Sequence, residues 1–162
     1  ARQELQAIID DVLRQERDPA KLRADVLKMR GEIAANKTAA GPLDAKLQRG
    51  GLVDCEFIVH YLQLRERIAL SPDLAPAIEE LMAGGLLPGD FRAHYDLLSR
   101  LLVGVRLLAP DCQPPPEAAR KVLAAACRTD DFAGLLRAID TARQGVARTW
   151  AETFGEPLEE PL

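Results

Sequence analysis

The chain has 162 residues, of which 48% are hydrophobic and 28% are charged, so it can form one domain with a hydrophobic core. This composition excludes a disordered polymer. The 21 basic and 25 acidic residues give a net charge of -4, which argues against a general nucleic-acid-binding protein because such proteins carry a basic surface.

The apolar residues are mainly leucine, alanine, valine and isoleucine, and aromatic residues make up only 4% of the chain. Leucine and alanine favour helices, whereas strands favour β-branched and aromatic residues. The composition therefore predicts packed helices.

The first half of the chain predicts three helices and one long loop. Apolar residues recur at helical spacing from Leu5 onward, which predicts the first helix. Asp18-Pro19 supplies an N-cap and a first-position proline for a second helix, whose pattern ends near Asn36. Residues 37–51 break the pattern and end in two glycines, so they predict a loop. Residues 52–70 predict a central buried helix, because apolar residues occur almost all the way round it.

The second half predicts four more helices. Gly84-Gly85 ends the first of them, and a long helix follows Pro88-Gly89-Asp90. The last two follow the proline-rich spacer, and the final one runs from Asp130 or Asp131 to Phe154. We therefore expect a single all-α domain over residues 1–162, an antiparallel bundle of about seven helices with a frayed tail over 155–162.

The cysteines and the hydropathy favour a cytoplasmic protein. Cys55, Cys112 and Cys127 cannot all pair within one chain and have no C-x-x-C spacing, so we expect buried thiols in a reducing compartment and no metal site. No apolar run approaches the roughly 20 residues that span a bilayer. We therefore expect no membrane and no nucleic acid among the partners.

Familiar catalytic motifs are missing from the sequence. It has no glycine-rich phosphate loop, and its two histidines, His60 and His94, stand alone on different helices, where packing or surface roles are the more common ones. Residues 20–50 carry seven basic and three acidic residues, which is more often a solvated face than a binding site.

One segment combines Lys46 with Gly50-Gly51 and two acids, Asp54 and Glu56, in the first turns of the central helix. Acids near a helix N-terminus stabilise it by about 0.3–1 kcal/mol. Residues two apart point about 200° apart on a helix, so the two acids should have separate roles and should not chelate one metal. If the helix is buried, at least one of them needs a partner on another element.

The run from Gly50 to Arg65, preceded by Lys46, resembles the helical segment of glutamine synthetase adenylyltransferases, with its G-G-apolar-x-acid-apolar-E-F-apolar pattern. The upstream run from Asp25 to Arg30 is similar to the V-x-x-M-R run of that family. The resemblance covers most of the chain and weakens after about Pro110.

The resemblance implies a large nucleotidyl-transferring enzyme with two halves, each a nucleotidyltransferase domain followed by a helical domain. One half removes AMP from glutamine synthetase, and the other transfers AMP from ATP to a tyrosine. The chain is most similar to the helical domain of the C-terminal, adenylylating half. We therefore expect a C-terminal fragment of a larger enzyme that acts as an accessory domain to the preceding nucleotidyltransferase domain.

The family's Gly-Ser motif and paired aspartates, which hold Mg²⁺, do not occur in this sequence. ATP and Mg²⁺ are therefore expected in the parent enzyme, and the fragment alone is expected to be inactive, with no catalytic residue of its own.

The resemblance gives Lys46, Gly50 and Gly51 as candidate nucleotide-binding residues. Asp54 and Glu56 are candidate supporting residues that position a basic group or the attacking hydroxyl. A simpler interpretation is that Lys46, Asp54 and Glu56 pair across the domain interface and fix its angle.

Two other functions stay open. The bundle could be a regulatory module that binds a PII-type signalling protein or glutamine synthetase itself, through the helices after Pro88. It could also be a generic helical scaffold.

Overall fold

The computed structural model describes residues 1–159, and within them it contains seven helices and no strand. They are α1 (Arg2–Arg14), α2 (Pro19–Asn36), α3 (Leu52–Glu66), α4 (Leu74–Ala83), α5 (Phe91–Leu108), α6 (Glu117–Ala126) and α7 (Phe132–Phe154). The predicted all-α antiparallel bundle is confirmed. No helix in this part of the chain is both long and apolar enough to cross a bilayer.

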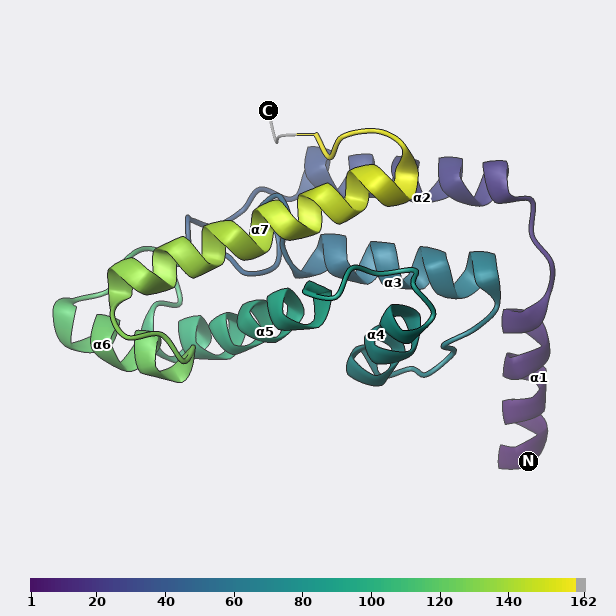
Figure 1. The fold of residues 1–162 in the computed structure, drawn as a ribbon, viewed down its shortest axis with the longest axis horizontal. Coiled ribbons are helices and arrows are strands. Elements are labelled where there is room, and N and C mark those ends of the chain that lie inside the picture. The colour runs from purple at the N-terminus through teal and green to yellow at the C-terminus, as the bar shows by residue number, and fades with distance from the viewer. Residues whose placement is uncertain (160–162) are drawn as a thin grey trace.

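Helix α3 lies at the centre of the bundle and packs against α2, α4, α5 and α7 (Figure 1). Eight of its fifteen residues are buried, which confirms the prediction drawn from its continuous apolar pattern. The long helix α7 lies along α5, α3 and α6 and buries Trp150 and Phe154, whose rings are 4.3 Å apart. The start of α3 lies beside the middle of α7, because Gly50 lies against the backbone of Arg143.

Two helix caps follow the predicted pattern. The carboxylate of Asp18 accepts from the N–H groups of Ala20 and Lys21, and that of Asp131 accepts from Gly134 N–H. The predicted end of the central helix near residue 70 is wrong, because α3 ends at Glu66. Arg67 and Ala69 adopt positive φ, and the Gln63 amide donates to the Ala69 carbonyl, so the chain turns away early.

Helix α1 differs from the others because it has no buried residue. It stands away from the bundle at one end of the molecule, whereas α6 lies at the opposite end (Figure 1). Arg17 donates to the carbonyls of Val12 and Leu13, which holds the turn between α1 and α2.

The tail was expected to fray from Gly155. In the described part, Leu158 is buried, its carbonyl accepts from Arg49 Nε at 2.8 Å, and Glu156 pairs with Arg23 at 2.8 Å. The rest of that expectation, residues 160–162, lies outside the described residues.

The cysteines are free thiols. Cys55 and Cys127 are buried as expected, whereas Cys112 is only half-buried. Burial raises the pKa of the Cys55 thiol well above its usual range, which keeps that group protonated.

Candidate functional site

Asp44 organises the loop that leads into α3. Its carboxylate accepts from the backbone N–H groups of Ala40 at 2.9 Å, Lys46 at 2.9 Å and Leu47 at 3.0 Å. Its own carbonyl accepts from Arg143 Nη2 of α7 at 2.9 Å. The loop is therefore closed on itself and tied to α7.

The pKa of Asp44 is lowered from its usual value of 3.8. Burial alone would raise the pKa, but the three backbone donors and the nearby Arg143 guanidinium stabilise the ionised form more strongly. A carboxylate held in this way stabilises the folded chain only while it is ionised.

Asp54 connects three parts of the molecule. Arg30 of α2 donates to both of its oxygens, from Nε at 2.5 Å and from Nη2 at 3.4 Å, and Gly50 N–H donates to Oδ2 at 2.8 Å. The Asp54 side chain is only 1% exposed, so it needs these partners. The prediction that at least one acid of the pair would need a partner on another element is confirmed by Arg30 of α2.

Burial raises the pKa of the Asp54 carboxyl, and the Arg30 guanidinium, the Gly50 N–H and the nearby Arg49 oppose that rise. Asp54 is therefore enclosed by groups of this same chain. Its contacts join α2, α3 and Gly50 within this chain.

Both glycines are accounted for by backbone packing. Gly50 has φ of +76°, and a Cβ there would overlap the backbone carbonyl of Arg143. A Cβ on Gly51 would lie 2.7 Å from the Lys46 carbonyl oxygen. The glycines thus let the loop approach α7 and the start of α3 closely.

The amide groups at the start of α3 are already engaged. Gly50 N–H donates to Asp54, Gly51 N–H donates to the Gln48 carbonyl at 2.8 Å, and Leu52 and Val53 donate to the carbonyls of Ala45 and Lys46. These groups would be the phosphate donors of an anion-binding helix N-terminus. The predicted nucleotide contacts of Gly50 and Gly51 therefore have no amide donor available here, and they stay predictions.

Lys46 and Glu56 are exposed, and neither has an ion-pair partner within residues 1–159. The Lys46 carbonyl accepts from Val53 N–H at 3.2 Å, and Glu56 lies one turn along α3 from Val53. The two charged side chains thus belong to the same end of α3. Asp54 and Glu56 have opposite environments, as their 200° separation predicts.

Most basic residues between positions 20 and 50 form ion pairs or hydrogen bonds within the chain. The side chains of five of these seven basic residues have partners, which are Asp25 for Lys21, Glu156 for Arg23, Glu32 for Lys28, Asp54 for Arg30 and the Leu158 carbonyl for Arg49. The interpretation of this stretch as an ordinary solvated face fits that pattern better than a binding site does.

Sequence reasoning missed three residues that build this region. Asp44 was visible as an acid two residues before Lys46, a spacing typical of turns in which a carboxylate accepts from following amides. Arg30 was part of the similar V-x-x-M-R run, but nothing in the run indicates its partner. Arg143 lies far away in the sequence and gave no signal.

The described residues do not fit a magnesium–nucleotide site. Among residues 1–159 no group of three histidine, cysteine or acidic side chains could hold a metal ion. Asp54 is enclosed, and the glycine amides are engaged. His60 is exposed, with Nδ1 at 2.8 Å from Gln63, and His94 is buried against Gly145, which agrees with the surface and packing roles expected of them.

Comparison with known proteins gives consistent matches to one enzyme. A bifunctional glutamine synthetase adenylyltransferase/adenylyl-removing enzyme of Rhizobium meliloti is 36% identical over 141 residues, which cover 82% of the chain. Enzymes with the same name from Bradyrhizobium and Agrobacterium fabrum are 30% and 33% identical, over 96% and 80% of the chain. The chain belongs to this family.

The family predicted from the run between Gly50 and Arg65 is thus confirmed. The chain spans only 14 to 17% of the length of these three adenylyltransferases, so it corresponds to one segment of them. No protein-family model matches the chain.

Proposed function

We propose that this chain is a helical accessory domain of a glutamine synthetase adenylyltransferase. It supports transfer of AMP from ATP to a tyrosine of glutamine synthetase by a nucleotidyltransferase domain elsewhere in the same cytoplasmic protein. We assign it to the C-terminal, adenylylating half. This proposal places ATP and Mg²⁺ in the nucleotidyltransferase domain.

One observation carries the proposal beyond family membership. The carboxylates of Asp44 and Asp54 accept hydrogen bonds from this chain and hold the loop and the start of α3 in place. Lys46 and Glu56 remain exposed at this end of the helix. A pair of charged side chains on a fixed backbone can meet a partner surface or a phosphate with little loss of conformational freedom. We infer that this end of α3 faces the nucleotidyltransferase domain.

The first test asks where the activity lies. AMP transfer to glutamine synthetase is measured for the 162-residue chain and for a longer protein that also contains the nucleotidyltransferase domain. We expect transfer by the longer protein only. Transfer by the chain alone would show that it holds an active site and would overturn the proposal.

The second test separates a role in transfer from a role in folding. In the longer protein, Lys46→Met and Glu56→Gln should each lower the transfer rate about tenfold without changing the unfolding midpoint. Lys28→Met and Glu32→Gln, on the exposed surface of α2, are matched controls that should leave both quantities unchanged. Asp54→Asn should lower the unfolding midpoint, because it leaves Arg30 without its anionic partner.

Wild-type transfer rates in both the Lys46 and the Glu56 variants would show that this end of α3 is not the functional surface. The alternative function, a binding module for a PII-type protein or for glutamine synthetase, stays a prediction.

A further inference from the structure

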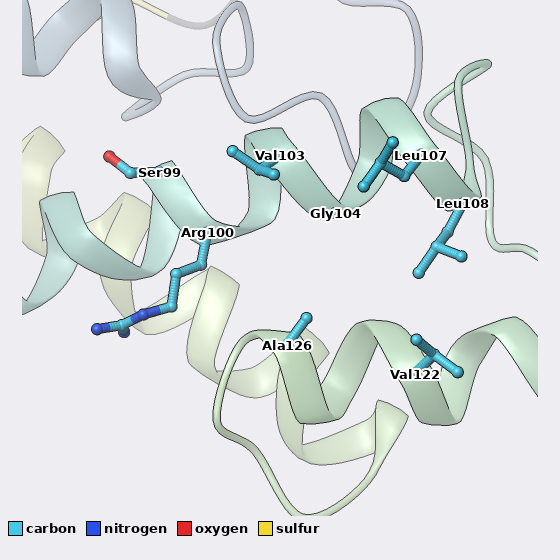
Figure 2. Close-up of a pocket in the computed structure, with 8 residues that line it drawn as sticks. All are labelled: Ser99, Arg100, Val103, Gly104, Leu107, Leu108, Val122 and Ala126. Carbon is cyan, nitrogen blue, oxygen red and sulfur yellow. The ribbon is translucent and has the colours of Figure 1, made fainter.

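An apolar groove of about 520 Å³ runs between α5 and α6. Figure 2 shows Leu108 of α5 and Val122 and Ala126 of α6 around the gap between the two helices. Leu107 is 78% exposed, and Val103 and Val122 are also largely exposed. Exposed apolar patches of this kind mark interaction sites on soluble proteins.

The surroundings of the groove are basic, although the whole chain is acidic. Residues 99–128 contain five basic and two acidic residues, and the chain carries a net charge of -4. Arg100 lines the groove and extends from α5 at one end of it (Figure 2). Arg106 and Lys121 are exposed on the two flanking helices, so the groove favours an apolar segment with acidic flanks.

Helix α1 has an exposed apolar face with acidic residues beside it. It has no buried residue, and Leu5, Ile8 and Val12 form an exposed apolar stripe in which Ile8 is 60% exposed. At 100° per residue, Glu4 and Asp11 lie directly beside that stripe. An amphipathic helix with apolar anchors three or four residues apart is the usual occupant of an apolar groove.

The two surfaces of one molecule are far apart, because α1 and α6 lie at opposite ends of its long axis (Figure 1). We propose that α1 of a second copy of this chain occupies the groove between α5 and α6. Two copies side by side in opposite directions can exchange their helices reciprocally, which gives a closed dimer with two-fold symmetry. This inference does not depend on the proposed function.

Sedimentation equilibrium of the 162-residue chain over a concentration series tests the proposal. We expect a concentration-dependent dimer, and Ile8→Glu and Leu107→Glu should each weaken dimerisation at least about tenfold. Leu136→Glu is the matched control, because Leu136 is 42% exposed on α7 and lies outside the groove. Far-UV circular dichroism confirms that each variant is folded.

Mixing the two variants gives the decisive measurement. The Ile8→Glu chain keeps an intact groove, and the Leu107→Glu chain keeps an intact α1, so the mixed dimer has one fully intact contact. An equimolar mixture should therefore associate more tightly than either variant alone. A wild-type chain that stays monomeric at about 0.5 mM would overturn the proposal. So would a dimer that survives both substitutions, since another surface would then join the copies.

Discussion

At the scale of single residues, three carboxylates within thirteen positions have three different environments. Asp44 is surrounded by backbone N–H groups, Asp54 by a guanidinium and one N–H group, and Glu56 lies at the surface. For Asp44 the three backbone donors and Arg143 outweigh burial and lower the pKa, whereas for Asp54 burial outweighs the donors and raises the pKa. Asp44 therefore gives the clearest pH dependence.

Asp44→Asn should be less stable than the wild type at neutral pH, by an amount that depends on pH. Because the folded pKa of Asp44 is lowered, its stabilising effect is fully present above its unfolded pKa of 3.8 and is lost as the pH falls through the folded pKa. The difference in unfolding free energy between the two proteins should thus be constant from about pH 5 to pH 8 and should shrink below about pH 4.

Urea unfolding at a series of pH values measures that difference. Asp10→Asn on α1, a carboxylate that accepts from the Gln6 side chain, is a control for the loss of one negative charge. A difference for Asp44→Asn that stays constant down to about pH 2 would show that the backbone N–H groups do not favour the ionised form.

The sequence predicted some of these residue environments and not others. The opposite orientations of Asp54 and Glu56 follow from helical geometry alone, and the structure confirms them. The donors around Asp44 come from a loop without periodicity, and Arg143 is 99 positions away. A periodic apolar pattern indicates which face of a helix is buried, so it gives no information on the side-chain hydrogen bonds of a loop.

At the scale of elements, the loop before α3 approaches α7 closely, backbone against backbone. Gly50 touches the backbone of Arg143, and Arg143 in turn donates to the Asp44 carbonyl. The glycine pair is thus explained by how closely two backbones approach. This contact can be tested by adding one methyl group.

Gly50→Ala should lower the free energy of unfolding by about 3 kcal/mol, because the new Cβ combines a positive φ with an overlap on a backbone carbonyl. Gly85→Ala is the matched control: Gly85 has a similar φ of +73°, but no atom lies within 4 Å of its added Cβ. The control should lose only about 1 kcal/mol, from backbone strain alone. Equal losses in chemical denaturation would contradict the close approach.

Helix existence was predictable from the sequence, but one helix boundary was not. Apolar spacing predicted all seven helices, since each must bury or present one face. The central helix ends at Glu66, before its apolar pattern does, because the side chain of Gln63 bonds the carbonyls of Ala69 and Ser71. A side-chain cap of that kind leaves no mark on the hydrophobic pattern.

At the scale of the whole molecule, the described part of the tail, residues 155–159, completes the core around α2 and α7. Leu158 is buried, and Arg23 and Arg49 donate to the carbonyls of Phe154 and Leu158. Composition suggested a frayed tail because glycine and proline flank the segment. The tail is held by contacts with residues more than 100 positions earlier.

Leu158→Ala should therefore lower the free energy of unfolding by about 2 kcal/mol, as expected for a buried leucine. Leu136→Ala, at a site that is 42% exposed on α7 and outside the groove, should lower it much less. Thermal and urea denaturation of the two variants make the comparison. A Leu158 variant as stable as the wild type would mean that the tail adds nothing to the folded core.

The bonds that hold the Asp44 loop have a consequence for biosynthesis. The donor to the Asp44 carbonyl lies on α7, and the acceptor for Arg49 is Leu158, so the loop meets these partners only after the residues up to Leu158 have been synthesised. Contacts of such long sequence separation form slowly, because a large loop must close first. We expect nascent chains that stop before α7 to leave this region open to proteolysis, and the loop that carries Lys46 to reach its folded form only after α7 has left the ribosome.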